Sequence, residues 1–173
     1  TGIIITDHFF YGNTAVDRSL PWGEWVNGFC KGYENALEEG NRIGLQVFFG
    51  WESGYKGTEF LIHGLDKDWL LAHPEIRDAD VKTQYELVHA GGGMVIHAHP
   101  FREAPYIPEI RLFPEYVDGV EAVNATHSGT LTKSRCMGHP EFNDRAIDYA
   151  DRHQLAKTAG SDQHSTEMVY GGM

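Results

Sequence analysis

Short apolar runs alternate with amphipathic helical patterns along nearly the whole chain, and this alternation most restricts the fold. Residues 2–8 begin with a β-branched run that predicts a strand covered on both faces. Further strands are expected at 45–52, 59–63, 94–97, 117–123 and 155–160. Helices are expected at 21–40 (or 21–44), at 66–73 and at 140–154, and a further helix is expected after Asp78, which would be its N-cap. Strands that alternate with helices predict βαβ units and a largely parallel sheet.

The first predicted helix carries an aromatic stripe. Trp22, Trp25, Val26 and Phe29 recur at spacings of three and four residues, which places them on one helical face. Core packing is the simpler interpretation of such a stripe, and a cofactor-binding face is the less favoured one.

Composition limits the class of protein. The chain has 173 residues, 41% of them hydrophobic, and a formal net charge of −11, which argues for one globular domain and against binding to a nucleic-acid backbone. No apolar run reaches the ~20 residues of a membrane span. The two cysteines, Cys30 and Cys136, form no disulfide framework and predict a reducing compartment such as the cytoplasm. The length is short for a closed eight-stranded barrel, which needs about 250 residues.

Chemically active side chains lie at the ends of five predicted strands. They are His8, Glu52, His63, the pair His97 and His99, and the pair Asp162 and His164. In parallel β/α folds the carboxyl ends of the strands build the ligand site, so these side chains are expected to converge although they are far apart in sequence.

Imidazole and carboxylate together form the ligand set of Zn, Mn and Fe sites. A single histidine in this set would be interpreted as a core residue, but the whole set favours metal, because unpaired carboxylates and imidazoles are costly to desolvate. His97 lies deeper in its strand and is expected in the core or behind a ligand. His127 follows Asn124 in a loop and is expected to stay outside the site more often than to reach it.

The ordered motifs resemble those of the PHP superfamily, the polymerase and histidinol phosphatase domain of metal-dependent phosphoesterases. The motifs are Thr6-Asp7-His8, Gly50-Trp51-Glu52, His63-Gly64-Leu65, Ala98-His99-Pro100-Phe101, Val120-Glu121-Ala122-Val123-Asn124 and Gly160-Ser161-Asp162-Gln163-His164. The resemblance implies an α/β fold, a distorted (β/α)7 TIM-like barrel with two or three divalent ions (Zn, Mn or Fe) at its mouth.

The resemblance also implies metal-binding roles for individual residues. His8 and His164 would share one ion, and Glu52 would bridge the other two. His63 and His99 would complete the second site, and Asp162 would bind the ion that it shares with Glu52.

One family motif has no counterpart in this sequence. The family pattern includes a leading strand that ends in His-x-His, whereas this chain opens on what corresponds to the second strand. Residues 1–173 are therefore expected to form a single PHP-like domain that lacks its first β/α unit. The alternative is a degenerate member that binds fewer ions.

The expected activity is hydrolysis of a small phosphorylated substrate by a metal-activated hydroxide at the C-terminal mouth of the barrel. Arg102 is the candidate phosphate ligand, with a solvated loop arginine as the alternative, and Lys133 and Arg135 are weaker candidates. An amidohydrolase-like C–N hydrolase and a non-catalytic domain that binds metal and a phosphorylated ligand remain open. Nucleic acid is expected only as a nucleotide-type substrate, and the sequence leaves substrate identity and oligomeric state open.

Overall fold

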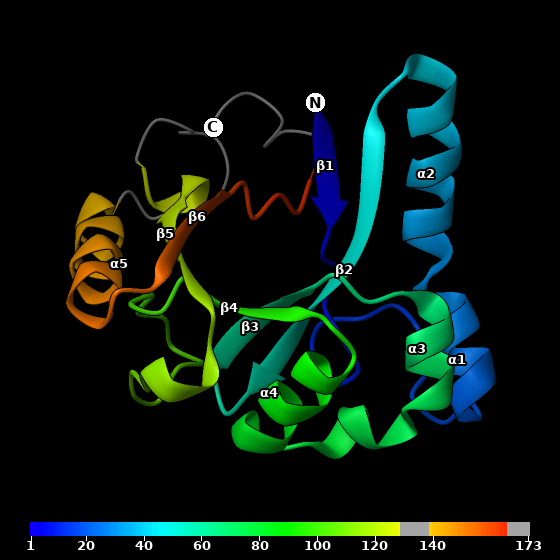
Figure 1. Cartoon of the computed structure of the whole chain (residues 1–173), viewed down its shortest axis with the longest axis horizontal. Coiled ribbons are helices and arrows are strands. Elements are labelled where there is room, and N and C mark those ends of the chain that lie inside the picture. The colour runs from blue at the N-terminus through cyan, green and yellow to red at the C-terminus, as the bar shows by residue number, and fades with distance from the viewer. Residues whose placement is uncertain (129–138, 166–173) are drawn as a thin grey trace. The chain divides into compact units, whose positions relative to one another are not determined.

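The computed structural model describes residues 1–128 and 139–165. Within these residues the chain forms strands and α-helices that alternate for most of its length (Figure 1). The strands are β1 (Gly2–Ile5), β2 (Gln46–Tyr55), β3 (Thr58–His63), β4 (Met94–Ala98), β5 (Gly119–Asn124) and β6 (Ala156–Gly160). The α-helices are α1 (Trp22–Phe29), α2 (Lys31–Ile43), α3 (Lys67–Ala72), α4 (Val81–Ala90) and α5 (Pro140–His153). Lys133, Arg135 and Cys136 lie outside the described residues.

The strands are hydrogen-bonded in their order along the chain, from β1 to β6. Residues 1–55 and 60–95 form one compact unit, and residues 56–59 with the described residues from 96 onward form a second. The α/β class and the order of elements expected from the sequence are confirmed. The described part of the chain has six strands, so seven β/α repeats remain a prediction.

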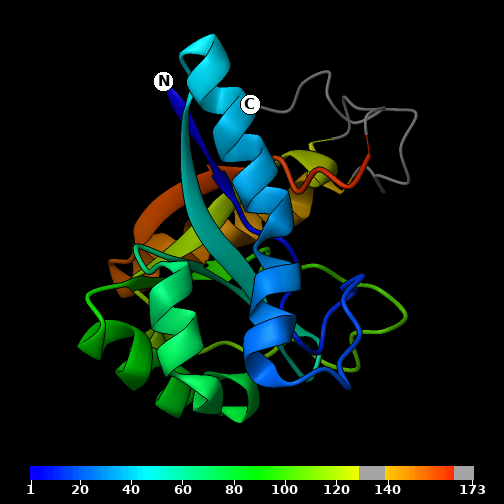
Figure 2. The same ribbon diagram turned by 90° about the vertical axis from the view of Figure 1, so that its right-hand side faces the viewer.

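The first unit begins with a parallel βαβ motif. β1 pairs in parallel with β2, with Ile4 opposite Phe48, and α1 and α2 form the crossover between them. In both views α2 runs along β2 (Figures 1 and 2). Trp25, Val26 and Phe29 of α1 are buried, which confirms that the aromatic stripe packs in a core.

The long helix expected from Pro21 is divided at Cys30 into α1 and α2. Gly28 and Gly32 flank the division and have low helix propensity. Both also permit close packing, since a Cβ at Gly28 would lie 3.1 Å from Val16 and one at Gly32 would lie 2.9 Å from Oδ2 of Asp7. Asp7 therefore packs against the start of α2.

A tight connection joins β2 to β3. Lys56 and Gly57 separate the two strands, and both have positive φ angles, of 51° and 86°. A two-residue connection of this kind joins antiparallel strands. The expectation of parallel strands is therefore wrong for this pair.

The helix cap before α4 also differs from expectation. Asp80 is the N-cap, and its side chain accepts a hydrogen bond from the Thr83 backbone at 2.8 Å. Asp78 instead ends a 3-10 turn (Pro74–Asp78) and forms an ion pair with Arg77.

The second unit holds β5, β6 and α5 as another parallel βαβ motif. β5 pairs in parallel with β6, and α5 lies against both strands (Figure 1). Phe142, Ala146 and Tyr149 of α5 pack with Val120 of β5 in an apolar cluster. At the carboxyl end of β5, Asn143 of α5 accepts a hydrogen bond from the Asn124 amide and donates one to the Asn124 carbonyl, both at 3.1 Å, which fixes this strand end beside several candidate site residues.

Candidate metal centre

Candidate ligands occur in both units. His8, Glu52 and His63 belong to the first unit, and His99, Asp162 and His164 belong to the second. The second unit also contains Arg102.

In the first unit, His8 and Glu52 meet at the carboxyl ends of two parallel strands. The parallel pairing of β1 with β2 continues as an isolated bridge between the two residues. The Glu52 amide donates to the Asp7 carbonyl at 3.0 Å, and the Phe9 amide donates to the Glu52 carbonyl at 2.8 Å. As a result, Nδ1 of His8 lies 3.0 Å from Oε2 of Glu52, whose residue is only 6% exposed.

His63 lies at the end of β3 remote from the hairpin turn. A Cβ at Gly50 would lie 3.1 Å from the His63 ring and 2.6 Å from the Ile62 carbonyl, which places His63 beside Gly50. Burial lowers the pKa of His63. Because β3 runs antiparallel to β2, its carboxyl end does not point the same way as that of β2. The expectation that His63 ends a parallel strand is therefore wrong, and its role as a ligand stays a prediction.

In the second unit, Arg102 and Asp162 form the centre of a polar group that we call the Arg102 cluster. Its other members are His99, Glu121, Asn124, Thr126 and His127. Arg102 forms an ion pair with Asp162, and its Nε donates to Nε2 of His127 at 3.2 Å. Burial alone would raise the pKa of the Asp162 carboxyl, but the charge of Arg102 holds it below its ordinary value. The carboxylate is therefore charged at neutral pH.

Two members of this cluster follow strands in unusual backbone conformations. His99 comes after β4 with φ of 25°, and Asp162 comes shortly after β6 with φ of 50°. Residues other than glycine are uncommon in this left-handed region, and such strain is concentrated at functional sites. The His99 amide donates to Oε2 of Glu121 at 3.0 Å, and this contact stabilises the turn at His99.

Glu121 and Asn124 lie three residues apart on β5, yet their side chains meet. A regular strand would direct them to opposite faces. The register with β6 shifts between Glu121 and Val123, and this bulge brings both residues to one side. Asn124 donates to Oε2 of Glu121 at 3.0 Å and to Oδ2 of Asp162 at 3.2 Å.

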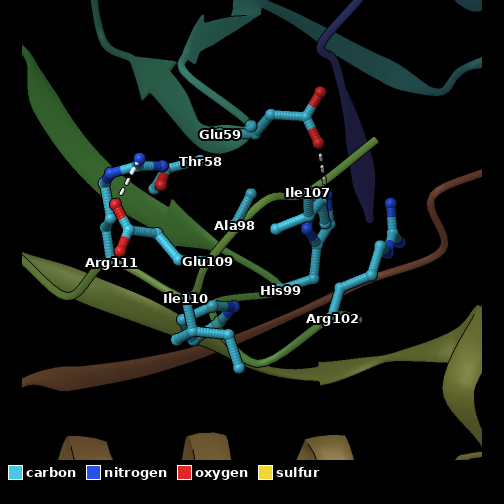
Figure 3. A pocket seen from close by; sticks show the side chains of 11 residues that line it. Thr58, Glu59, Ala98, His99, Arg102, Ile107, Glu109, Ile110 and Arg111 are labelled. Atoms are coloured by element: carbon cyan, nitrogen blue, oxygen red, sulfur yellow. Dashed lines mark ion pairs between the residues drawn. The ribbon is translucent and has the colours of Figure 1, made fainter. Parts of the chain in front are cut away.

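Three residues near the candidate ligands were not expected from the sequence. Glu59 lies 3.3 Å from Nε2 of His99, as the dashed line in Figure 3 marks. Glu121 is 3% exposed, and burial raises its pKa. His127 belongs to the Arg102 cluster, although it was expected to stay outside. Two signals were available: His127 closely follows β5 as His99 follows β4, and Glu121 lies in one of the motifs that carry the family resemblance, although no role was assigned to it.

His97 and His164 differ in how far they are buried. His97 is fully buried, with its ring 6.0 Å from that of Tyr149, which confirms a position in the core. The His164 side chain is half-exposed, and its Nδ1 lies 2.9 Å from the carbonyl of Asp162.

A pocket in the second unit lies beside the Arg102 cluster. Figure 3 shows Arg102 and His99 on one side of it, and Glu59 beyond His99. Ile107 and Ile110 add apolar surface to its wall. Its volume of about 10 Å³ is room for about one water molecule, so the pocket itself does not hold an organic ligand.

The donor sets fit divalent metal ions. His8 with Glu52, and His99 with Glu59, each combine an imidazole nitrogen with a carboxylate oxygen at 3.0 and 3.3 Å. Such nitrogen and oxygen donors suit Zn, Mn or Fe. Glu52 and His99 are both buried, so an ion bound there would be held largely out of water.

Burial of two histidines predicts a loss of stability in acid. Burial lowers the pKa of His97 to about 3, and burial followed by the charge of Arg102 lowers that of His127 to about 4. Both titrate near 6.5 in the unfolded chain. Between these pKa values the unfolded chain binds more protons than the folded one. The contribution of the two histidines to the free energy of unfolding is therefore fully present above about pH 6.5 and decreases as the pH falls toward 4.

Urea unfolding at pH 7.5, 5.5 and 4.5 tests this expectation. The free energy of unfolding should fall by about 1.4 kcal/mol per pH unit for each of the two groups. His97→Leu removes one titration and should make the slope shallower by that amount. A His97→Leu slope equal to that of the parent chain would contradict the assignment.

Comparisons with known proteins agree with the motifs. A family model described as PHP-associated matches residues 140–169. A two-domain protein from Bacteroides vulgatus, named for a predicted PHP-like metal-dependent phosphoesterase, has a similar structure, with a TM-score of 0.61 and 17% identity. A protein from Bifidobacterium adolescentis, provisionally named a metal-dependent phosphoesterase, has a TM-score of 0.57 and 18% identity.

The alignments cover most of this chain and differing shares of the two proteins. They include 94% of this chain and 43% of the Bacteroides chain, and 98% of this chain and 79% of the Bifidobacterium chain. No curated protein is similar enough to count as a match. The two solved structures share the fold of this chain, and the PHP-associated family model matches its C-terminal part, where one of the motifs lies. Among the described residues, no helix is both long and apolar enough to cross a membrane.

Proposed function

We propose that this protein is a metal-dependent phosphoesterase that hydrolyses a small phosphorylated substrate. The observation that carries the proposal is the buried His8–Glu52 contact at the ends of two parallel strands, in a fold shared with proteins named for this activity. The Arg102 cluster adds an imidazole, a carboxylate and a guanidinium beside a pocket.

The proposed ligands of two or three Zn, Mn or Fe ions are His8, Glu52, His99, Asp162 and His164. Glu59 joins this set because of its contact with His99. His63, which the resemblance also implies, lies four residues along β3 from Glu59, about 13 Å at ~3.3 Å per residue, and would therefore serve a different ion from Glu59. When bound, such ions lower the pKa of water toward neutrality and neutralise charge on phosphoryl oxygens.

The remaining chemistry belongs to the side chains. Arg102 is the proposed phosphate ligand, since a guanidinium donates two parallel hydrogen bonds to phosphoryl oxygens. Glu121 holds the turn at His99 through the backbone amide, and Asn124 orients Asp162. Ile107 and Ile110 line a hollow of about 290 Å³ beside Arg102 and would contact the organic group of the ester there.

We also propose a cytoplasmic location. The described cysteine, Cys30, is buried, and burial raises the pKa of its thiol to about 11. Such a thiol is unreactive, so the proposal rests on the two cysteines of the sequence, which form no disulfide framework.

A paired substrate screen tests the proposed activity. The chain is stripped with a chelator, loaded separately with Zn²⁺, Mn²⁺ or Fe²⁺, and assayed on an aryl phosphate and on a cyclic amide. We expect phosphate release with at least one metal, and strong losses in Asp162→Ala and His99→Ala. Cleavage of the amide alone would favour an amidohydrolase-like enzyme. Phosphate binding without turnover would favour a non-catalytic domain.

A further inference from the structure

The atoms that surround the Arg102 guanidinium are of the kinds that bind metal ions. Nε donates to the His127 imidazole at 3.2 Å, and Nη2 donates to the Thr126 hydroxyl at 3.4 Å. The same Nη2 donates to Oδ2 of Asp162. An imidazole nitrogen, a hydroxyl and a carboxylate oxygen are also acceptable partners of a divalent cation.

Asp162 cannot serve both cations through the same oxygen. Its Oδ2 already accepts hydrogen bonds from Arg102 and from Asn124. The side chains of Arg102 and Asp162 are only 16% and 10% exposed, so water screens their charges weakly. The other oxygen, Oδ1, lies 3.4 Å from Nδ1 of His164. A divalent ion on either oxygen of Asp162 would lie close to the guanidinium, and repulsion between the two weakly screened positive charges opposes their simultaneous binding.

The Arg102 side chain also borders open space outside the cluster. It lines the pocket that contains Glu59, His99, Ile107 and Ile110, and Figure 3 shows it at the edge of this pocket beside His99. It also lines an adjoining hollow of about 290 Å³ beside Glu103 and Pro108. This volume is several times the ~30 Å³ that a water molecule occupies in the liquid. A phosphate group in this hollow would lie within reach of the guanidinium.

We propose that Arg102 and a divalent cation are alternative partners of Asp162, and that a phosphate group bound by Arg102 releases this carboxylate for the cation. Cation and phosphate then bind cooperatively, because each favours the same position of Arg102. The inference rests on the proposed function in one respect, since it takes Asp162 as a metal ligand.

The expected size of the coupling follows from linkage. If phosphate increases the affinity for the cation, the cation increases the affinity for phosphate by the same factor, and such factors are typically about 5- to 150-fold. Arg102→Met removes the competing charge and keeps most of the apolar side chain. This variant should bind the cation more tightly without phosphate and gain nothing from its addition.

Calorimetric titration of the metal-stripped chain with Mn²⁺ measures the coupling directly. The phosphate mimic is methylphosphonate, which is not hydrolysed. For the parent chain we expect methylphosphonate to tighten Mn²⁺ binding by about fivefold or more. For Arg102→Met we expect tight binding that methylphosphonate leaves unchanged, and the added substitution Asp162→Asn should abolish that gain.

Arg152→Met is the matched control. Arg152 belongs to the same unit, lies on α5 and donates to the Asp148 carbonyl at 3.3 Å, outside the Arg102 cluster and the hollow. It should keep both the parent affinity and the methylphosphonate effect. The inference is overturned if Arg102→Met binds Mn²⁺ no more tightly than the parent chain does. It is also overturned if methylphosphonate does not change the Mn²⁺ affinity of the parent chain, a measurement that requires no substitution.

The inference and the proposed function can fail separately. Coupled binding without hydrolysis of any phosphate ester would retain the inference and remove the activity. Metal-dependent hydrolysis without coupling between Mn²⁺ and methylphosphonate would retain the proposed activity and remove the inference.

Discussion

Glu52→Gln is expected to lower kcat/KM for an aryl phosphate by about 10³-fold, because a metal site contributes several kcal/mol of transition-state stabilisation. Glutamine keeps the size of the side chain but loses the negative charge and one acceptor oxygen. Glu52 is 6% exposed and lies 3.0 Å from His8, so solvent cannot replace the lost interaction. The measurements are steady-state kinetics and metal content by atomic absorption.

Glu86→Gln is the control for this substitution. Glu86 lies on α4 and pairs with Lys82 at the surface, where loss of the charge should change neither activity nor metal content. A Glu52→Gln protein with full metal content and activity within a few-fold of the parent would remove Glu52 from the site.

Gly160→Ala is expected to lower the free energy of unfolding by about 3 kcal/mol, near the upper end of the cost of overpacking. A Cβ at Gly160 would lie 2.0 Å from Oε1 of Glu121. The carboxylate cannot easily move, because Oε2 accepts hydrogen bonds from the His99 amide and from Asn124, both at 3.0 Å. Urea unfolding at neutral pH measures the loss.

A double-mutant comparison tests the cause of this loss. In a Glu121→Ala background the carboxylate is absent, so the further change Gly160→Ala should cost little. Gly54→Ala is the matched control, since a Cβ there would meet nothing within 4 Å. An equal cost of Gly160→Ala in both backgrounds would show that contact with Glu121 is not responsible.

Much of the fold was predictable because hydrophobic periodicity is a local signal. The β-branched run at the start of the chain and the amphipathic pattern of α5 each predict their element without tertiary information. The hairpin at Lys56–Gly57 was missed because its residues are not the Asn-Gly or Asp-Gly pair that most strongly indicates such a turn. The division at Cys30 depends on how closely Val16 and Asp7 approach α1 and α2, which periodicity does not encode.

The candidate site was predictable only where strand ends reveal it. The ends of β1 and β2 bring His8 to Glu52, as the parallel pairing requires. Glu121 could not be found in this way, because its position beside Asn124 depends on a bulge that shifts the register with β6. Glu59 lies beyond the hairpin turn, and its contact with His99 joins segments that are distant in sequence.

Metal reconstitution of the stripped chain tests the central claim most directly. Mn²⁺ is added in steps while bound metal and hydrolysis of an aryl phosphate are followed in the same samples. If hydrolysis depends on bound metal, the stripped chain should hydrolyse almost no aryl phosphate. The rate should then rise with bound Mn²⁺ and reach a plateau when the two or three proposed sites are filled. Equal hydrolysis by the stripped and loaded protein would contradict this dependence on metal.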